Sequence, residues 1–320
     1  MVSDDIAAGS LVELLPAYSI SVQMDRRRFL AIAALAGAAD AAPPERPAIR
    51  KRIGRNAETL PVIGLGTWLT FDVGDDTAEH LLRRQVLQRF FAAGGGMIDS
   101  SPMYGRAEWL LGELLRTLPH EGGLFTATKV WTPFDRLGPT QLEQSLKLWR
   151  VPRFDVLLVH NLLNWRSHLK TLRLWKEQGR VRYIGVSTSH GSKHDEAVRV
   201  IRNEPIDVLQ ITYNFADTSA EPVMNLAAER GLAVVINRPF DGGDLFSRVG
   251  QRPLPAWANE IDCANWAQFF LKWVVSHPAV TCAIPATRNP AHLDQNMGAG
   301  LGRLPEAAWR RRMQASLERG

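Results

Sequence analysis

Residues 154–187 read FDVLLVHNLLNWRSHLKTLRLWKEQGRVRYIGVS. Residues 154–160 form an apolar run of strand length, residues 169–178 carry a helical pattern, and residues 182–187 form a second apolar run. Gly179 follows the helical segment, at a position where a helix end commonly requires the left-handed conformation that glycine tolerates. A strand, a helix and a second strand in this order predict one βαβ unit of a parallel sheet.

The same alternation continues on both sides of this unit, and we count eight strand-helix units from residue 60 onward. The other strands are expected at 62–66, 96–99, 124–129, 208–212, 233–237 and 280–285, and the other helices at 77–93, 107–115, 140–149, 195–202, 222–230, 266–276, after 290 and at 304–317. Eight units predict an α/β fold, a (β/α)8 TIM barrel, rather than an open Rossmann sheet. Residues 64–67, GLGT, also lack the third glycine of a dinucleotide fingerprint. Residues 49–61 predict an N-terminal β-hairpin that closes the bottom of the barrel.

Composition excludes disorder and gives little support to nucleic-acid binding. The chain has 320 residues, 45% hydrophobic and 22% charged, which is enough to bury a full core. Its 38 basic and 33 acidic residues are interspersed, so the net charge of +5 forms no long basic stripe. Cys263 and Cys282 are the only cysteines, and they are expected to be buried and unpaired, with no metal site.

The first part of the chain departs from this even mixture. Residues 24–42 read MDRRRFLAIAALAGAADAA, in which a basic cluster precedes Phe-Leu, a short Ala-rich apolar run and an A-x-A cleavage candidate. This layout resembles a bacterial twin-arginine signal, although Asp25 and Ala31 replace residues that are usual in it. The apolar run is too short to be a permanent membrane anchor.

The signal predicts periplasmic localisation through the twin-arginine export machinery, or cytoplasmic localisation if the signal is not used. Met24 stands where such a signal should begin, so we expect it to be the true start. The chain then divides into a leader, 1–41, and a barrel, 42–320. The alternative for the leader is an ordinary amphipathic or disordered segment.

Polar residues recur at the expected strand ends. Asp99, Lys129 and His160 end three successive strands, and Tyr104 follows the first of them closely. In a barrel of this type, the strand ends meet at one mouth, where the chemistry takes place. Each residue alone has an ordinary explanation as a helix cap or a solvated group, and only their joint placement indicates a site.

Six motifs lie in order along the chain: LPVIGLGTW (60–68), IDSSPMYGRAE (98–108), TKVW (128–131), LLVHN (157–161), YIGVST (183–188) and AIPATRNPAHLDQN (283–296). Together they resemble the aldo-keto reductase family over about residues 49–300. The resemblance implies an NADPH-dependent oxidoreductase that reduces an aldehyde or ketone to an alcohol by hydride transfer. It places the family's catalytic tetrad on Asp99, Tyr104, Lys129 and His160.

The resemblance gives each tetrad residue a role. Lys129 would stabilise the Tyr104 phenolate and so lower a phenol pKa that is ordinarily near 10, and Asp99 would hold Lys129. His160 would orient the substrate carbonyl, and Tyr104 would donate the proton. The sequence does not decide between Tyr104 and His160 as the proton carrier in each direction.

The resemblance also implies a cofactor site. Asn161, Ser187 and Gln210 would hold the nicotinamide carboxamide, while Gly66, Thr67 and Trp68 would approach the nicotinamide ribose. Asn237 and Arg238 occupy a segment where many members place a stacking Tyr and a Ser. We expect Arg238 to contact the cofactor. This segment offers no Tyr side chain to stack on the nicotinamide.

Cofactor choice depends on the segment after the last strand. Ala286 and Thr287 follow Pro285 where many members have Lys and Ser, and His292 replaces a later Arg. Arg288 is the compensating cation, next to a helix start at Pro290 that favours phosphate. We therefore expect the cofactor to be NADPH, with NADH possible. Thr287, Arg288 and Asn296 would hold it in this segment. The alternative for Arg288 is a solvated loop cation.

Aromatic residues in the strand-end loops predict an apolar pocket for a small carbonyl substrate, formed by Trp68, Trp131 and Trp165. Helix-barrel packing is expected to take other tryptophans, such as Trp149 and Trp273. The rival reading of the whole chain is a non-catalytic nucleotide-binding barrel that acts as an auxiliary or sensor subunit. A metal-dependent hydrolase is disfavoured, because the expected His and carboxylate clusters are missing from the strand ends.

Overall fold

The computed structural model describes residues 47–120, 123–189 and 191–318. The predicted leader and export signal lie outside these residues. Among the described residues, no helix is long and apolar enough to cross a membrane.

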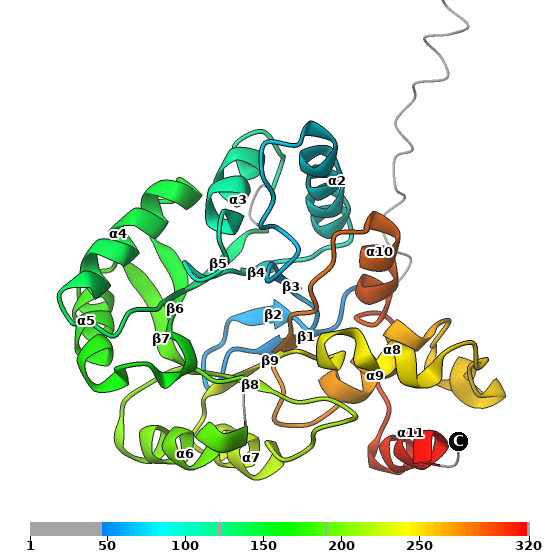
Figure 1. The fold of residues 1–320 in the computed structure, drawn as a ribbon. Coiled ribbons are helices and arrows are strands. Elements are labelled where there is room, and N and C mark those ends of the chain that lie inside the picture. The colour runs from blue at the N-terminus through cyan, green and yellow to red at the C-terminus, as the bar shows by residue number, and fades with distance from the viewer. Residues whose placement is uncertain (1–46, 121–122, 190, 319–320) are drawn as a thin grey trace, which may run out of the picture. The chain divides into compact units, whose positions relative to one another are not determined.

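An eight-stranded parallel sheet forms the centre of the unit that spans Ala42–Gly320 (Figure 1). The strands follow one another in chain order: β3 (Leu65–Gly66), β4 (Met97–Asp99), β5 (Phe125–Val130), β6 (Phe154–Val159), β7 (Val181–Ser187), β8 (Val208–Thr212), β9 (Ala233–Asn237) and β10 (Cys282–Ala283). Isolated parallel bridges between Ile63 and Ala283 and between Gly66 and Ala286 join the first strand to the last. The predicted (β/α)8 barrel is therefore confirmed.

The first and last strands are shorter than the sequence predicts, at two residues each. Their flanking residues still cross the seam with regular hydrogen bonds, from Gly64 N to Ala283 O at 2.8 Å and from Gly66 N to Pro285 O at 3.0 Å. A Cβ on Gly66 would lie 2.7 Å from Ile284 O. The close approach of the β3 and β10 backbones at this seam thus requires glycine at position 66 and leaves little room for a long, regular series of strand hydrogen bonds.

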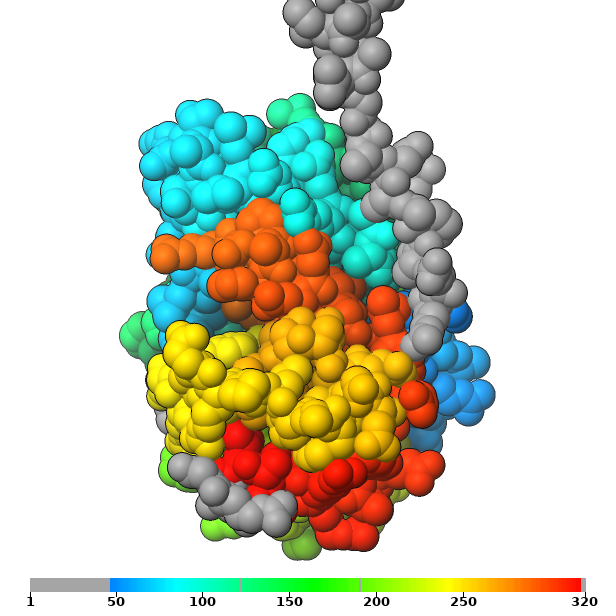
Figure 2. Space-filling view, turned by 90° about the vertical axis from the view of Figure 1, so that its right-hand side faces the viewer, coloured from blue at the N-terminus to red at the C-terminus, as the bar shows by residue number. Residues whose placement is uncertain are grey.

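Helices surround the barrel, as Figure 1 shows. They are α2 (Thr77–Ala92), α3 (Ala107–Leu115), α4 (Leu137–Trp149), α5 (Trp165–Glu177), α6 (His194–Asn203), α7 (Glu221–Glu229), α8 (Asp244–Val249), α9 (Trp266–Val275), α10 (Pro290–Gly298) and α11 (Ala307–Glu318). Figure 2 shows α10, in orange, between α2, in cyan, and the segment of α8 and α9, in yellow. Helix α8 was not predicted, because six residues are too few for a periodic pattern to be distinct.

A hairpin of β1 (Arg50–Arg52) and β2 (Thr59–Pro61) precedes the barrel, as predicted. Its turn is fixed by Gly54, whose φ of 55° suits glycine, and by a hydrogen bond from Arg55 N to Gly231 O at 3.2 Å. Ile53 and Leu60 are buried in one apolar cluster with barrel residues such as Phe125 and Leu158. The hairpin therefore closes the end of the barrel opposite the strand carboxyl ends.

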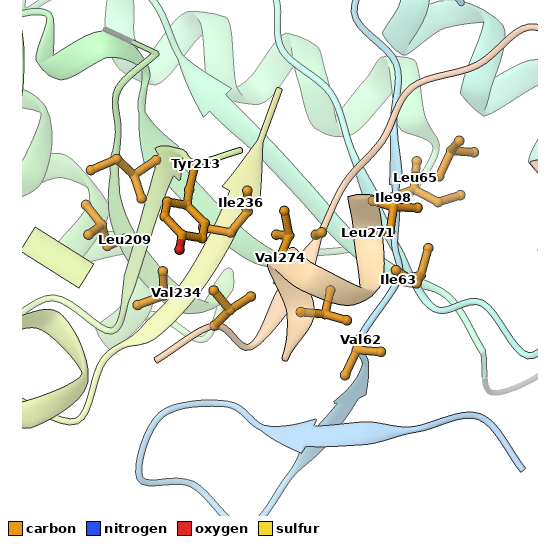
Figure 3. Close-up of a cluster of buried hydrophobic side chains, with 14 of the residues drawn as sticks. Val62, Ile63, Leu65, Ile98, Leu209, Tyr213, Val234, Ile236, Leu271 and Val274 are labelled. Atoms are coloured by element: carbon orange, nitrogen blue, oxygen red, sulfur yellow. The ribbon is translucent and has the colours of Figure 1, made fainter. Parts of the chain in front are cut away.

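A second and larger apolar cluster lies between the strands and the helices (Figure 3). It includes strand residues such as Ile98 and Ile236, packed with Leu271 and Val274 of α9. Trp149 and Trp273 belong to this cluster, as predicted, and are 1% and 0% exposed. These two layers fix the strands rigidly, so the residues at the strand ends are held in defined positions.

Candidate active site

A cavity of about 460 Å³ opens at the carboxyl ends of the strands. Its walls come from the ends of β3, β4, β6, β9 and β10 and from the loops that follow them. The lining includes Gly66, Thr67, Trp68, Leu69, Asp99, Met103, Tyr104, His160, Asn161, Asn237, Arg238, Phe240, Gly242, Gly243, Phe246, Pro285 and Ala286. The cavity thus lies where a barrel of this architecture carries its chemistry.

A buried ion pair lies at the base of this cavity. Strand β4 pairs with β5 so that Asp99 faces Ala127, and Lys129, two residues further along β5, projects to the same side as Ala127. Lys129 Nζ donates to Asp99 Oδ2 at 2.6 Å and to Ser100 O at 2.8 Å. The second carboxylate oxygen, Asp99 Oδ1, accepts from Gln210 Nε2 at 2.9 Å.

Burial favours the neutral form of Lys129, but its partners outweigh this effect. The Asp99 charge and hydrogen bond, together with Tyr104, raise the pKa of Lys129 above its usual value. The side chain is 0% exposed and stays an ammonium at neutral pH. A permanent positive charge is therefore fixed in a region of low dielectric.

Tyr104 lies in the turn after β4, where its backbone N–H donates to Ser101 O at 2.9 Å. Lys129 Nζ lies 5.2 Å from the centroid of the phenol ring. Burial raises the pKa of Tyr104, and Lys129 offsets only part of that rise. Lys129 therefore lowers the pKa of Tyr104, as expected, but desolvation of the phenolate is the larger effect and sets the net direction.

His160 follows β6 at the start of the short 3-10 helix η1 (His160–Leu162). Burial, and then the charge of Lys129, lower the pKa of His160 to about 2, so its imidazole is neutral. The His160 and Tyr104 rings meet edge to face, with centroids 5.7 Å apart and an interplanar angle of 85°. The four residues of the expected tetrad are therefore neighbours at one end of the cavity.

Ser101 is a polar residue that the sequence reasoning did not single out. It is fully buried, and its Oγ lies 2.9 Å from His160 Nδ1. The sequence signal that could have identified Ser101 is its position between Asp99 and Tyr104, because both of these residues were already expected in the site.

The expected cofactor residues divide into two groups. Gly66, Thr67, Trp68, Asn161 and Arg238 line the cavity. The remaining expected cofactor residues are not among the residues that line the cavity: Ser187, Gln210, Thr287, Arg288 and Asn296. Ser187 and Gln210 are buried beneath it, and the Ser187 hydroxyl accepts the Asn161 N–H at 3.2 Å.

Asn237 and Arg238, at the end of β9, differ in how their side chains are held. Asn237 is held within the sheet, since its Oδ1 accepts from Thr212 Oγ1 at 2.6 Å and its Nδ2 donates to Thr188 O at 3.1 Å. Arg238 has a φ of 47°, and its guanidinium lies 5.9 Å from the centroid of the Trp68 ring and 3.5 Å from Asp241. The Arg238 guanidinium thus lies over the Trp68 ring in the cavity lining, where the two residues follow strands on either side of β10.

Helix α10 begins beside the exit of β10. Asn289 caps it by accepting from Ala291 N at 2.9 Å, and Pro290 occupies its first turn. Thr287 Oγ1 accepts from Asn289 N at 3.1 Å, so this turn is ordered, while Arg288 is exposed and Asn296 is buried. The helix start therefore places the Arg288 cation and the positive end of the helix dipole two residues beyond Ala286, which lines the cavity.

The three expected substrate-pocket tryptophans occupy different places. Trp68 lines the cavity and is 38% exposed, whereas Trp131 is 42% exposed and lies outside the described lining. Trp165 is buried in the helix layer, where its indole N–H donates to Glu196 at 2.9 Å. Phe240 and Phe246 line the cavity instead, and sequence reasoning missed both because Phe240 lies in the loop after β9 and Phe246 lies on α8, neither of which was predicted as part of the site.

Comparison with known proteins identifies the family of the chain. The aldo/keto reductase family model matches residues 62–316, which is most of the chain. The chain belongs to the aldo/keto reductase family. That membership agrees with the resemblance seen in the sequence motifs.

Individual members of the family are distant in sequence. The chain is 26% identical over 238 residues to pyridoxine 4-dehydrogenase of Escherichia coli, covering 67% of this chain and 79% of that protein. An uncharacterised oxidoreductase of Schizosaccharomyces pombe is 24% identical over 244 residues, covering 75% and 71%. An aldo/keto reductase of Klebsiella pneumoniae, solved in complex with NADP and acetate, matches the fold with a TM-score of 0.69 and 24% identity, covering 86% of this chain and 95% of that one.

Proposed function

We propose that the protein is an NADPH-dependent oxidoreductase that reduces an aldehyde or ketone to an alcohol, with Tyr104 as the proton donor. The observation that carries this proposal is the buried Lys129–Asp99 ion pair, which lies beside the Tyr104 phenol and the neutral His160 imidazole in one cavity. Membership of the aldo/keto reductase family supports the same reaction class.

The residues present fit a dinucleotide. Gly243, with a φ of 111°, lines the cavity, and a Cβ placed on it would meet no atom within 4 Å. The backbone at this wall therefore leaves space for a bound ligand. Asn161 and Arg238 offer an amide and a guanidinium to the same space. A bound reduced nicotinamide would supply the hydride. Asn161, whose Oδ1 accepts from Ser189 Oγ at 3.1 Å and whose backbone N–H donates to Ser187 Oγ at 3.2 Å, would hold the nicotinamide carboxamide together with Ser187 and Gln210.

The protein's own residues account for the proton. Reduction of a carbonyl places negative charge on its oxygen, and that oxygen must gain a proton. The Tyr104 phenol is protonated at neutral pH because its pKa is raised by burial. As the phenol gives up its proton, the fixed charge of Lys129 stabilises the phenolate, and Asp99 holds that charge in place.

His160 cannot serve as a cationic proton donor at neutral pH, because its pKa is lowered to about 2 by burial and by Lys129 and the protonated form is absent. A neutral imidazole still carries one N–H, which can donate a hydrogen bond to the carbonyl oxygen. His160 therefore orients the substrate, and proton donation falls to Tyr104.

We assign NADPH rather than NADH as the preferred cofactor, with NADH as the weaker alternative. Arg288 is an exposed cation directly before a capped helix start, and both features favour an additional phosphate. The apolar walls contributed by Trp68, Phe240 and Phe246 suit a small carbonyl compound with an apolar body.

The test is the oxidation of NADPH by the purified protein with a panel of aldehydes and ketones, followed by the absorbance of the reduced nicotinamide. The Tyr104→Phe variant is expected to bind NADPH normally and to lose about 10³-fold in kcat, because it keeps the ring and lacks the proton. Binding of NADPH without turnover, unchanged in Tyr104→Phe, would favour the non-catalytic nucleotide-binding barrel.

We further propose that the protein is exported by the twin-arginine machinery, on the strength of the sequence of residues 24–42 alone. Because that route carries folded proteins, the cofactor would be bound before export. Fractionation of cells expressing the full chain should place the processed protein and tightly bound nucleotide in the periplasm. A protein found only in the cytosol with its leader intact would contradict this.

A further inference from the structure

One serine connects the two groups that would face the substrate oxygen. Ser101 lies between β4 and Tyr104, and its carbonyl accepts the Tyr104 backbone N–H at 2.9 Å. Its hydroxyl lies 2.9 Å from His160 Nδ1. The same short turn therefore fixes the backbone that carries Tyr104 and contacts the imidazole of His160.

The hydrogen bonds of Ser101 decide which nitrogen of His160 carries the proton. In the part of the chain that the structure describes, Ser101 Oγ has two partners, Met103 N at 3.2 Å and His160 Nδ1 at 2.9 Å. The Met103 N–H can only donate, so Oγ accepts that bond. The single hydroxyl hydrogen then has one acceptor within reach, which is Nδ1.

The opposite assignment leaves a group unsatisfied. If Nδ1 carried the hydrogen, Ser101 Oγ would accept two hydrogen bonds and its own hydrogen would have no partner. Ser101 is 0% exposed, so an unpaired hydroxyl hydrogen there would be costly. The geometry therefore selects the imidazole with Nδ1 unprotonated and Nε2 protonated.

We propose that Ser101 is a positioning residue that holds His160 in its Nε2–H tautomer, so that the cavity-lining imidazole presents a hydrogen-bond donor to the carbonyl oxygen of the substrate. The catalytic part of this inference rests on the proposed function. Neutrality of His160 agrees with it, because only a neutral ring has two tautomers to choose between.

The variant Ser101→Ala tests the role with the smallest change of volume. It removes the hydroxyl that Nδ1 accepts from and leaves the backbone bond to Tyr104 in place. We expect kcat for carbonyl reduction to fall about 10-fold, the loss typical of one hydrogen bond, with the Kd for NADPH unchanged. Nitrogen NMR of the free protein should show one tautomer of His160 in the wild type and a mixture in Ser101→Ala.

Ser145→Ala is the matched control. Ser145 is also a buried serine, 1% exposed, and its hydroxyl donates to Glu108 at 2.9 Å, away from the cavity lining. This variant removes one buried hydrogen bond of similar length and is expected to lower the melting temperature while kcat and the His160 tautomer stay unchanged. An equal loss of kcat in both variants would assign Ser101 a merely structural role.

The two readouts separate failure of the inference from failure of the proposed function. A wild-type His160 with its proton on Nδ1, or kcat in Ser101→Ala within about 2-fold of the wild type, would overturn the inference. A wild-type protein that shows the Nε2–H tautomer, loses it in Ser101→Ala and reduces no carbonyl compound would support the tautomer assignment and overturn the proposed function.

Discussion

Two lysines of this barrel are equally buried, and one lies at the cavity while the other lies in the helix layer. Lys129, at the cavity, donates to the carboxylate of Asp99 and lies beside the phenol of Tyr104. Lys272, on α9, donates to three backbone carbonyls, those of Ile261, Leu301 and Arg303, at 2.8 to 2.9 Å. Both side chains are 0% exposed.

The difference lies in what each charge can influence. The three carbonyl bonds of the Lys272 ammonium tie the end of η4 (Ala256–Ile261) and the segment after α10 to α9, so this lysine stabilises the fold. Lys129 has an ionisable partner and an ionisable neighbour next to a cavity, so its charge can alter proton transfer there. Burial alone does not distinguish the two lysines, whereas the position of Lys129 beside the cavity and its titratable residues does.

The largest expected effect comes from replacing each lysine with methionine. Lys129→Met should lower kcat by about 10³-fold, because the phenolate of Tyr104 loses its stabilising charge. Lys272→Met should keep kcat near the wild-type value and lower the free energy of unfolding by about 3 kcal/mol, since three backbone carbonyls lose their donor. Turnover assays and urea unfolding of both variants measure this difference. Loss of turnover in a folded Lys272→Met variant would contradict the assignment of a purely structural role to Lys272.

An intermediate effect is expected from a cation at the surface. Arg288→Ala should raise the Kd for NADPH about 10-fold and leave the Kd for NADH unchanged, because only NADPH carries the additional phosphate. The control is Arg311→Ala, an exposed arginine on α11. Fluorescence titration of both variants with both nucleotides gives the comparison. Equal weakening of NADPH and NADH binding by Arg288→Ala would show that the residue does not read that phosphate.

The smallest effect is expected from pH. Carbonyl reduction requires the protonated phenol, and the pKa of Tyr104 is raised above its usual value by burial. The pKa of His160 is lowered to about 2, far below the working range. The kcat for reduction should therefore change less than about 2-fold between pH 6 and pH 9 and fall only as pH rises through the Tyr104 pKa. A step in the kcat profile near pH 6.5 would reveal a titrating His160 and contradict this.

The sequence predicted the barrel well because its pattern is repeated and local. Runs such as 208–212 and 233–237 match β8 and β9 to the residue, since buried parallel strands are continuous apolar segments bounded by turn residues. The seam between β3 and β10 was predicted too long, because its pairing depends on a close approach that only the three-dimensional structure shows.

The candidate site was predictable only in part. Asp99 and Lys129 are brought together by strand register, which the parallel-sheet prediction already implied. The balance between burial and Lys129 at Tyr104 depends on solvent exposure, and the link from Ser101 to His160 depends on side-chain placement. The wall from Phe246 depends on a six-residue helix that carries no distinct periodic signal, and the wall from Phe240 depends on the course of the loop before it.

The most direct test follows the hydride itself. Purified protein would be incubated with a carbonyl compound and NADPH that carries deuterium at the transferable position of the nicotinamide, and the alcohol product would be examined by mass spectrometry. The account predicts one deuterium on the carbinol carbon with the wild-type protein and almost no labelled alcohol with Tyr104→Phe. Tight binding of NADPH with no labelled alcohol from any aldehyde or ketone would contradict it.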